Sequence, residues 1–312
     1  MGRRVLVLGG SGFVGRHLVA RLVQAGYFVM VPTRRRDSAR TLMLLPTCEV
    51  EEADVHEPAV LARLVARADV VVNLVGILHE NRRQAFARVH VELVKSLLSA
   101  CQRAGVQRLV HMSALNAGAD APSSYLTSKG EGEALVAGSP LAWTIFRPSV
   151  IFGRGDSFLG LFAKLLRVLP VMALASPDAK FQPVHVDDVA HCFAVAIDEK
   201  RTTGQRYDLC GPRVYTLREL VAWVGETTGH VRPIIPLSPA MASIQAALLE
   251  RLPGPLLTRD NLASMTCANV CSGPFPAIFG REPAALEAVA PAYLAPEAIR
   301  SSFDGYRVSG GR

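Results

Sequence analysis

A glycine-rich segment near the start of the sequence restricts the fold more than any other feature. Gly9, Gly12 and Gly15 stand between a short apolar run at residues 5–8 and a helical pattern that ends at Gly26. In such a setting the first glycine permits a sharp turn, the second lets backbone approach a diphosphate, and the third lets helix pack against strand. The amino end of the helix offers N–H groups to the anion. The residues expected to surround the diphosphate are Gly9, Ser11, Gly12, Phe13, Val14 and Gly15.

The first half of the chain alternates strand and helix patterns. Apolar runs typical of buried parallel strands occur at residues 5–8, 27–31, 50–55, 69–75, 108–112 and 143–146. Helical spacing appears between them, most clearly at residues 86–105 and 125–136. Strands separated by helices predict an α/β fold, with a doubly wound parallel Rossmann sheet covered on both faces.

The residues after the second expected strand bear on the choice of nucleotide. Proteins of this fold place a carboxylate there to hold the ribose 2′-hydroxyl of NAD, or arginine to hold the 2′-phosphate of NADP. Here Arg34, Arg35 and Arg36 come first, and the earliest carboxylate is Asp37. Arginine can chelate a phosphate through paired N–H groups. We therefore expect Arg34 and Arg35 to favour NADP(H), with NAD(H) as the alternative.

The ends of the later strands supply further candidate cofactor contacts. Asp54 and Val55 follow the third expected strand, where Asp54 either accepts from the adenine amino group or caps the next helix. Asn73 ends the fourth strand where the nicotinamide ribose is expected, and the backbone of the three residues after it would line the cofactor. Pro148 ends the sixth strand beneath the expected nicotinamide. The three residues after Asn73 are Leu74, Val75 and Gly76.

A tyrosine and a lysine stand four residues apart on one expected helix. This spacing places Tyr125 and Lys129 on the same helix face. A nearby cation favours the phenolate, so Tyr125 is expected to exchange a proton near neutral pH. Ser113, at the end of the fifth expected strand, would hold a substrate oxygen. These three residues are the candidate catalytic group.

Domain organisation follows from a change of pattern after Pro148. There the alternation loosens and prolines become frequent. We expect residues 1–150 to form an NAD(P)-binding Rossmann domain, with residues 183–211 returning to it. Residues 151–182 and 212–312 are expected to form a smaller mixed lobe that receives a substrate or partner. Within that lobe, Thr216 and Glu219 have the spacing of a capping box at a helix start.

Other polar residues receive structural interpretations. Arg147 is expected to serve as an ion-pair partner, and His111 as a core or edge histidine. His185 precedes Asp187 and Asp188, where a helix cap and first turn explain the two acids better than a metal site. No metal site is expected.

Composition excludes several classes of protein. The net charge is +7, 29 of the 34 basic residues are arginine, and aromatic residues make up only 6%. Nucleic-acid binding needs basic clusters interleaved with aromatics, so no nucleic-acid partner is expected. The six cysteines form no CxxC pair, which suggests buried thiols in a reducing compartment.

The most apolar stretch, residues 158–174, carries Lys164, Arg167 and Pro170 and is too interrupted to span a bilayer. It is expected to pack as a lid on the second lobe, or else to make peripheral contact with a membrane or partner. With no signal peptide or transmembrane helix expected, the predicted location is cytoplasmic, with peripheral attachment at the inner membrane as the alternative.

The glycine loop, the strand order and the Tyr-x-x-x-Lys pair together resemble the short-chain dehydrogenase/reductase superfamily in its extended or atypical branch. In that superfamily the Tyr–Lys pair is the catalytic acid/base, and the lysine also holds the nicotinamide ribose. The resemblance therefore implies that Lys129 contacts the cofactor as well.

Longer segments narrow the resemblance, which covers essentially the whole chain. HMSALNAGADAPSSYLTSKGEGE, FQPVHVDDVA and LLTRDNL are similar to the subgroup of the NADPH-binding accessory subunit of respiratory complex I (alpha-subcomplex subunit nine) and its bacterial relatives. In that subgroup NADPH is mainly a structural element, and a fungal relative acts in ubiquinone biosynthesis. The resemblance implies a structural, assembly or quinone-linked redox role, with complex I or quinone-biosynthesis proteins as partners. A soluble NADPH-dependent carbonyl reductase or nucleotide-sugar epimerase/dehydratase is the alternative, and substrate turnover stays open.

Overall fold

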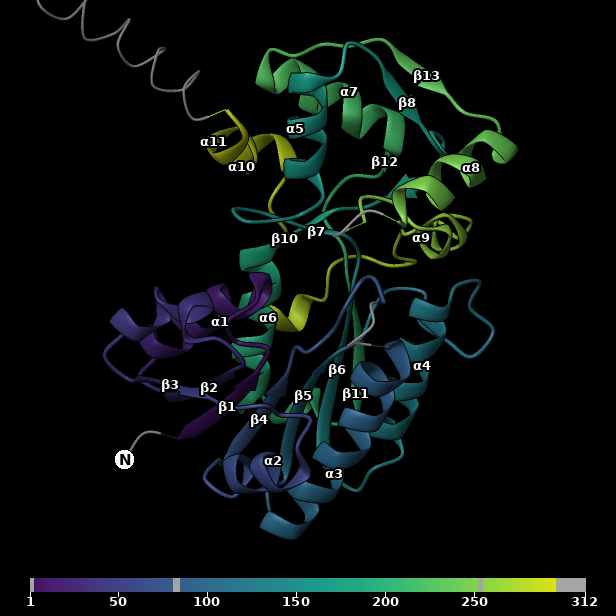
Figure 1. The fold of residues 1–312 in the computed structure, drawn as a ribbon. Coiled ribbons are helices and arrows are strands. Elements are labelled where there is room, and N and C mark those ends of the chain that lie inside the picture. The colour runs from purple at the N-terminus through teal and green to yellow at the C-terminus, as the bar shows by residue number, and fades with distance from the viewer. Residues whose placement is uncertain (1–2, 81–84, 252–254, 296–312) are drawn as a thin grey trace, which may run out of the picture. The chain divides into compact units, whose positions relative to one another are not determined.

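The computed structural model describes residues 3–80, 85–251 and 255–295. Within these ranges, seven strands form one sheet in the order β11-β6-β5-β4-β1-β2-β3 (Figure 1), and every neighbouring pair is parallel. The order reverses between β1 and β4, and α/β sheets bind ligands at such a reversal. The predicted doubly wound parallel sheet is confirmed. The strands are β1 (Arg4–Leu8), β2 (Phe28–Thr33), β3 (Cys48–Glu52), β4 (Val70–Asn73), β5 (Arg108–Met112), β6 (Ala142–Pro148) and β11 (Gln205–Leu209).

Helices cover both faces of this sheet (Figure 1). On one face α1 packs against α6, and on the other α3 packs against both α2 and α4. The apolar stripes of these helices bury against the strands, as a sheet without a polar face requires. The helices are α1 (Phe13–Gln24), α2 (Pro58–Val65), α3 (Leu93–Ala104), α4 (Ser124–Ala137) and α6 (Val186–Asp198). Short 3₁₀ turns lie at Arg36–Ala39, Leu42–Leu44, Lys200–Thr202 and Ala277–Phe279.

The long helix expected at residues 86–105 is present but irregular at its start. Its first part, Ala87–Glu92, is a π-helical turn, and regular α-helix begins only at Leu93. Apolar periodicity located the helix because Val89, Leu93 and Leu97 are buried as expected. Periodicity does not distinguish a π turn from an α turn.

A second set of elements surrounds its own core. The pairs β7–β10, β9–β12 and β8–β13 form two-stranded sheets, and the helices pack around Phe152, Leu166 and Leu220. The predicted capping box between Thr216 and Glu219 is present. The strands are β7 (Ile151–Phe152), β8 (Met172–Leu174), β9 (Lys180–Phe181), β10 (Val184–His185), β12 (Tyr215–Thr216) and β13 (Ile234–Pro236). The helices are α5 (Leu159–Val168), α7 (Leu217–Thr228), α8 (Pro239–Leu249), α9 (Arg259–Ser264), α10 (Leu286–Val289) and α11 (Pro291–Leu294).

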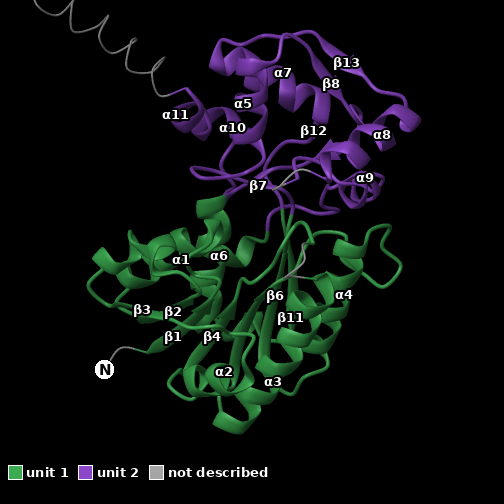
Figure 2. Cartoon of the chain, in the orientation of Figure 1, with its two compact units in different colours: residues 1–148, 186–209, 276–281 green, residues 149–185, 210–275, 282–312 purple. Residues whose placement is uncertain are grey.

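The chain thus divides into two compact units (Figure 2). Unit 1 comprises residues 1–148, 186–209 and 276–281, and unit 2 comprises residues 149–185, 210–275 and 282–312. The segment at residues 276–281, expected in the smaller lobe, belongs to unit 1. It is held there by a 2.8 Å contact between His191 Nε2 and the Phe279 carbonyl, and by an ion pair between Arg281 and Asp188.

Helix α5 forms the first part of the apolar stretch at residues 158–174. Leu159 and Leu166 are buried, and Phe158, Phe162 and Leu165 pack on the core of unit 2. Most of its apolar side chains therefore face inward. In the described part of the chain, no helix combines the length and apolar character that a bilayer crossing requires.

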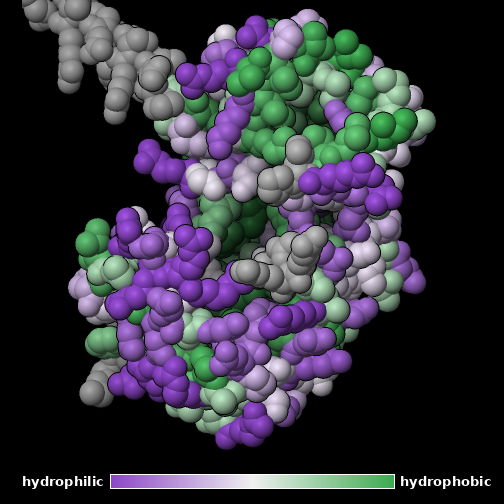
Figure 3. Space-filling view, in the orientation of Figure 1, coloured by the Kyte–Doolittle hydropathy of each residue, from purple (hydrophilic) through white to green (hydrophobic). Residues whose placement is uncertain are grey.

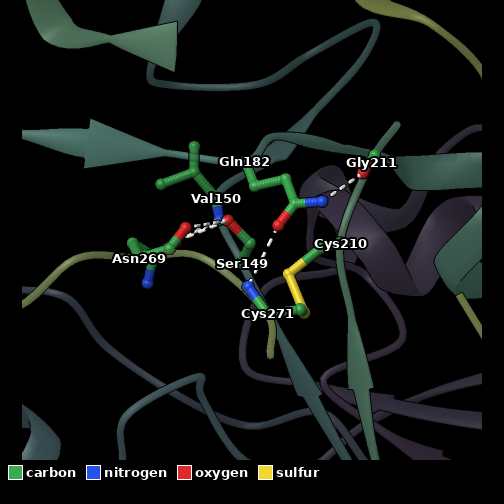
Figure 4. Close-up of a disulfide and its surroundings, with 7 residues drawn as sticks. All are labelled: Ser149, Val150, Gln182, Cys210, Gly211, Asn269 and Cys271. Atoms are coloured by element: carbon green, nitrogen blue, oxygen red, sulfur yellow. Dashed lines mark hydrogen bonds between the residues drawn. A yellow bond between two sulfur atoms is a disulfide. The ribbon is translucent and has the colours of Figure 1, made fainter. Parts of the chain in front are cut away.

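The expectation that all cysteines are free thiols is wrong. Cys101 and Cys192 are free and buried as expected, but Cys210 and Cys271 form a disulfide across 61 residues within unit 2 (Figure 4). The Gln182 amide sits beside it, donating to the Gly211 carbonyl at 2.7 Å and accepting from the Cys271 N–H at 3.0 Å. Pairing over such a distance in sequence depends on tertiary structure, so spacing motifs do not reveal it.

Candidate functional site

The glycine loop lies in unit 1, between the end of β1 and the start of α1. Gly9 has a positive φ of 79°, which side chains disfavour. A Cβ on Gly15 would lie 2.4 Å from the Gly9 carbonyl oxygen, so only glycine lets α1 approach the loop this closely. Gly12 is the N-cap of α1, and no side chain in the described ranges caps that helix start. The first N–H groups of α1, from Phe13 onward, therefore suit an anion such as a diphosphate.

Hydroxyl groups connect this loop to the end of β2. The Ser11 hydroxyl donates to Thr33 Oγ1 at 3.3 Å, and Thr33 Oγ1 lies 3.0 Å from the Ser38 hydroxyl. Arg16 spans the same gap, donating to the backbone carbonyls of Ser11 and Ser38, each at 3.0 Å. The sequence pattern assigned no role to Arg16, although this residue directly follows Gly15 and therefore lies at the edge of the loop.

The arginines expected to select the nucleotide follow β2 immediately. Arg34 and Arg35 are exposed. Asp37, the earliest carboxylate, forms a 2.7 Å ion pair with Arg40. NAD-binding proteins hold the ribose with a carboxylate at the end of this strand. Neither β2 nor the two residues after it contain a carboxylate. Exposed arginine therefore follows β2 directly, while Glu52 of the edge strand β3 lies opposite Thr33.

Asp54 and Val55 lie in the turn between β3 and α2. The Asp54 carboxylate accepts from the His56 N–H at 3.0 Å, and the N-cap of α2 is Glu57. The alternative that Asp54 caps α2 is therefore wrong, because its side chain closes a local turn four residues before the helix begins at Pro58. Burial lowers the pKa of His56, while the Asp54 and Glu92 carboxylates act to raise it and Arg88 and Arg34 act to lower it. Charges of both signs therefore lie around this turn.

The loop after β4 lies directly against the glycine loop. The Leu74 N–H donates to the Leu8 carbonyl at 2.9 Å, and a Cβ on Gly9 would lie 3.0 Å from the Leu74 carbonyl carbon. Asn73 is 2% exposed and accepts from the Val75 N–H at 3.1 Å through its side-chain oxygen. Its amide nitrogen lies 3.2 Å from His111 Nδ1. Asn73 therefore shapes the backbone at residues 74–76, and His111 is buried as expected.

Helix α4 carries both the tyrosine and the lysine. The Ser123 side chain caps it by accepting from the Leu126 N–H at 3.2 Å. Lys129 is 4% exposed, and its ammonium donates to the Met112 carbonyl at 2.9 Å. That ammonium would lie 3.3 Å from a Cβ on Gly76. The structure thus brings Lys129 to the loop after β4, where a nicotinamide ribose is expected.

The protonation states differ from the sequence-based expectation. Burial raises the pKa of Tyr125 to about 12. Burial lowers the pKa of Lys129 to about 8, although Glu133 acts in the opposite direction. The expected exchange of the Tyr125 proton near neutral pH is not met in this structure, because desolvation of the phenolate outweighs the nearby cation. Tyr125 is a neutral phenol here.

A buried carboxylate on α4, that of Glu133, pairs with two arginines. Glu133 is 3% exposed and accepts from Arg147 and Arg206, each through Nε at 2.8 Å. Burial works to raise the pKa of Glu133, but its contacts, chiefly with Arg147, outweigh burial and keep that pKa below its usual value. The Ser113 hydroxyl is buried and makes no hydrogen bond within the described ranges. Arg147 is an ion-pair partner, as expected.

The π-helical turn delivers His90 to this region. His90 Nε2 accepts from the Ile77 N–H at 3.2 Å, and Nδ1 lies 2.9 Å from the Ser128 hydroxyl. The Ser128 hydroxyl donates to the Tyr125 carbonyl at 2.8 Å. Because Nε2 accepts, the proton of the neutral ring belongs on Nδ1, and burial lowers the pKa of His90 to about 3. His90 thus ties the loop after β4 to α4.

The helix predicted over residues 86–105 contains His90, but the sequence pattern assigns that residue no role. Its aromatic neighbours are Phe86, stacked at 5.6 Å between ring centroids, and Tyr125 at 5.7 Å. A histidine at a π turn is a candidate functional residue, because such turns often occur at functional sites.

The remaining expected residues are placed as follows. Pro148 is buried at the end of β6, where its carbonyl accepts from the Leu115 N–H at 3.1 Å. Asp187 and Asp188 lie in the first turn of α6, which begins at Val186 rather than after an Asp187 cap. Asp187 pairs with His17 at 2.6 Å, so these acids join helices of unit 1.

Comparison with known proteins gives one family match over most of the chain. The family described as the NAD dependent epimerase/dehydratase family matches residues 5–210. NADH dehydrogenase (ubiquinone) 1 alpha subcomplex subunit 9 of Arabidopsis thaliana is 32% identical over 80% of this chain, which spans 65% of that protein. The protein of the same name in Mus musculus is 31% identical over 90% of this chain and 77% of its own length. Ceramide reductase of Caulobacter vibrioides is 33% identical over 60% of this chain and 58% of its own length.

Solved structures share the fold at lower identity. NADPH-dependent quinone oxidoreductase of Escherichia coli, complexed with NADPH, has a TM-score of 0.74 at 20% identity, covering 93% of this chain and 99% of that one. UDP-glucose 4-epimerase of Thermus thermophilus, complexed with NAD, has a TM-score of 0.62 at 21% identity, covering 85% and 99%. Together with the family match, the glycine loop at the sheet reversal assigns the chain to the NAD-dependent epimerase/dehydratase family, which binds NAD(P).

Proposed function

We propose that this chain is an NADP(H)-binding protein of the complex I accessory-subunit type, with a quinone-linked or carbonyl-reducing activity at Tyr125 and Lys129. The observation that carries the nucleotide preference is the charge at the end of β2. Arg34 and Arg35 follow the strand directly, and Asp37 is paired with Arg40. A 2′-phosphate would meet guanidinium groups there rather than a carboxylate.

The proposed site residues divide into three groups by position. The glycine loop would hold the diphosphate, the residues after β2 and β3 the adenosine, and the residues after β4, β6 and α4 the nicotinamide riboside. The residues assigned are Gly9, Ser11, Gly12, Phe13, Val14, Gly15, Arg34, Arg35, Asp54, Val55, Asn73, Leu74, Val75, Gly76, Lys129 and Pro148.

The state of Tyr125 favours reduction over oxidation as the reaction. NADPH, when bound, supplies a hydride. Reduction of a carbonyl or quinone oxygen also needs a proton, and Tyr125, with a pKa of about 12, holds one throughout the physiological range. Lys129 would orient the ribose and stabilise negative charge on the phenol oxygen as the proton leaves.

A second candidate role is cofactor holding without turnover. It is favoured by Lys129, whose ammonium would lie 3.3 Å from a Cβ on Gly76, in the loop after β4. At that place Lys129 could hold the ribose without any proton transfer by Tyr125. Under this role we propose that the chain stabilises an assembly such as complex I, or proteins of quinone biosynthesis. A soluble carbonyl reductase or nucleotide-sugar epimerase remains the alternative enzyme.

Two measurements on the full chain test the proposal. Mass spectrometry of nucleotide released from protein purified without added cofactor is expected to detect NADP(H). Turnover of NADPH is then followed over a panel of quinones and carbonyl compounds for the native chain and Tyr125→Phe. Turnover lost in Tyr125→Phe with NADPH binding retained supports the reductase. Retained NADPH without turnover in either protein supports the holding role, and release of NAD(H) alone contradicts the proposed preference.

A further inference from the structure

Helix α8 of unit 2 has a burial pattern opposite to that of an ordinary surface helix. Its buried residues are Ala242 and Ala246, whereas Met241, Ile244 and Leu248 are 56%, 62% and 59% exposed. Surface helices of soluble domains turn large apolar side chains toward the core and polar ones toward water. Residues 239–249 contain no Asp, Glu, Lys or Arg. The large side chains of α8 therefore form an apolar stripe that points away from the core of unit 2.

The stripe continues onto neighbouring segments. Gln245 in α8 donates to the Ala173 carbonyl in β8 at 3.2 Å, and β8 pairs with β13. Arg232, before β13, donates to the Leu169 carbonyl at 3.0 Å, which brings in the end of α5. Figure 3 shows apolar side chains gathered over this part of unit 2. We define the apolar face as Val168, Val231, Ile235, Met241, Ile244 and Leu248, each more than half exposed.

Charge restricts what can cover the apolar face. The two sequence ranges that form it, residues 158–177 and 227–249, carry three formally charged side chains, and all are positive: Lys164, Arg167 and Arg232. Three acids lie one residue beyond these ranges: Asp178 and Glu226, which are exposed, and Glu250, which pairs with Arg259. A second copy of the chain, related by symmetry, would bring these cations toward their own counterparts. A surface of anionic phosphates would instead neutralise them. Exposed apolar side chains beside cations are the combination that enters the boundary between lipid headgroups and acyl chains.

We propose that the apolar face of unit 2 docks on an anionic lipid surface, with α8 in the plane of the interface. The large side chains of α8 enter the headgroup boundary, and Lys164 and Arg167 at α5 meet lipid phosphates. This places the contact on α8 and β13 rather than on the buried side of α5. Docking does not depend on the nucleotide or on turnover.

Vesicle flotation of the full chain tests this proposal. Phosphatidylcholine vesicles with and without phosphatidylglycerol are compared at low and high salt. The double variant Ile244→Gln/Leu248→Gln removes two exposed side chains, so folding is expected to be unaffected, and thermal unfolding verifies this. Leu44→Gln is the matched control, because Leu44 is 84% exposed in unit 1. Lys164→Gln/Arg167→Gln removes two of the cations.

The native chain and Leu44→Gln are expected to float with the phosphatidylglycerol vesicles, and salt should weaken this binding. The α8 double variant should bind at least roughly tenfold more weakly, and the cation variant should lose the dependence on phosphatidylglycerol. No binding to anionic vesicles at low salt, or equal binding by the α8 variant, overturns the proposal. Self-association without lipid that the α8 variant abolishes also overturns it, by assigning the face to a second copy.

Discussion

Lys129 is a charged group held where a charge is costly. It is 4% exposed, and burial lowers its pKa to about 8 from 10.5. At neutral pH the ammonium form is therefore less favourable in the folded chain than in the unfolded one. Such a group costs folding free energy, and proteins retain that cost where function needs the charge.

We predict that Lys129→Met stabilises the chain at pH 7 by roughly 2 kcal/mol, after allowing for the lost hydrogen bond to the Met112 carbonyl. The gain should disappear near pH 10, because the native lysine is then neutral when folded while still protonated when unfolded, so native stability rises between pH 8 and 10. Urea unfolding at both pH values measures this, with exposed Lys95→Met as control. Equal effects at both pH values would contradict it.

His90 and His111 make acid sensitivity a property of unit 1. Burial lowers the pKa of each ring to about 3 from 6.5. Between these values the unfolded chain binds protons that the folded chain does not, so stability falls as pH drops below about 6.5.

We predict that His90→Phe, which leaves the Ile77 N–H without its acceptor, lowers the free energy of unfolding by about 1–3 kcal/mol. His90→Gln, whose side-chain oxygen can accept, should recover part of this. Urea unfolding from pH 7 to pH 5 measures both effects, and a Phe variant as stable as the native chain would refute the role of His90.

For these residues the sequence predicts the position on a helix or strand, but not the protonation state or the hydrogen-bond partners. A spacing of four on a helix placed Tyr125 and Lys129 on α4, since helical geometry fixes that relation. Protonation of Tyr125 depends on how much water the fold excludes, which spacing does not report. Ser113 was found at its strand end, but the burial of its hydroxyl without a hydrogen-bond partner in the described ranges depends on tertiary packing. His90 was placed on the right helix, while its contact with Ile77 depends on the π turn.

At the scale of elements, the junction of β1 and α1 depends on contacts between backbone atoms. The strand-then-helix pattern predicted this junction because three closely spaced glycines after an apolar run are typical of a tight turn between a strand and a helix. The bounds of the third strand differ from the prediction: residues 50–55 were expected and Cys48–Glu52 observed. That strand lies at the sheet edge, is only partly buried, and so has a weak apolar pattern.

We predict that Gly15→Ala destabilises the chain by about 2–4 kcal/mol and abolishes nucleotide binding. Its Cβ would lie 2.4 Å from the Gly9 carbonyl oxygen, so α1 must move away from the loop. Gly118→Ala is the control, because a Cβ there meets nothing within 4 Å. Thermal unfolding and a nucleotide titration read the two effects. A Gly15→Ala protein that binds nucleotide normally would show that close packing at the loop is unnecessary.

At the level of the whole molecule, the alternation of strands and helices predicted most of unit 1. It did not predict that a short segment from late in the sequence also belongs to unit 1. Residues 276–281 join unit 1 through contacts of Phe279 and Arg281 with α6, which lies far away in sequence. The disulfide in unit 2 is of the same kind, joining Cys210 to Cys271. Long-range contacts of this sort leave little local signature.

We predict that Cys210→Ala/Cys271→Ala lowers the free energy of unfolding of unit 2 by about 2–4 kcal/mol under oxidising conditions, because the disulfide closes a long segment of the unfolded chain. With dithiothreitol present, the native chain and the variant should unfold alike. Urea unfolding with and without the reductant makes the comparison. A native chain insensitive to the reductant and no more stable than the variant would exclude a stabilising disulfide.

We propose that unit 1 binds NADP(H) between the glycine loop and the arginines after β2. Calorimetric titration of the full chain with NADPH and with NADH tests this binding, using Arg34→Gln/Arg35→Gln as the variant and Arg201→Gln, an exposed ion-pair arginine elsewhere in unit 1, as the control. We predict at least roughly tenfold tighter binding of NADPH, lost in the double variant and kept in the control. Tighter binding of NADH, or no binding of either nucleotide, would contradict it.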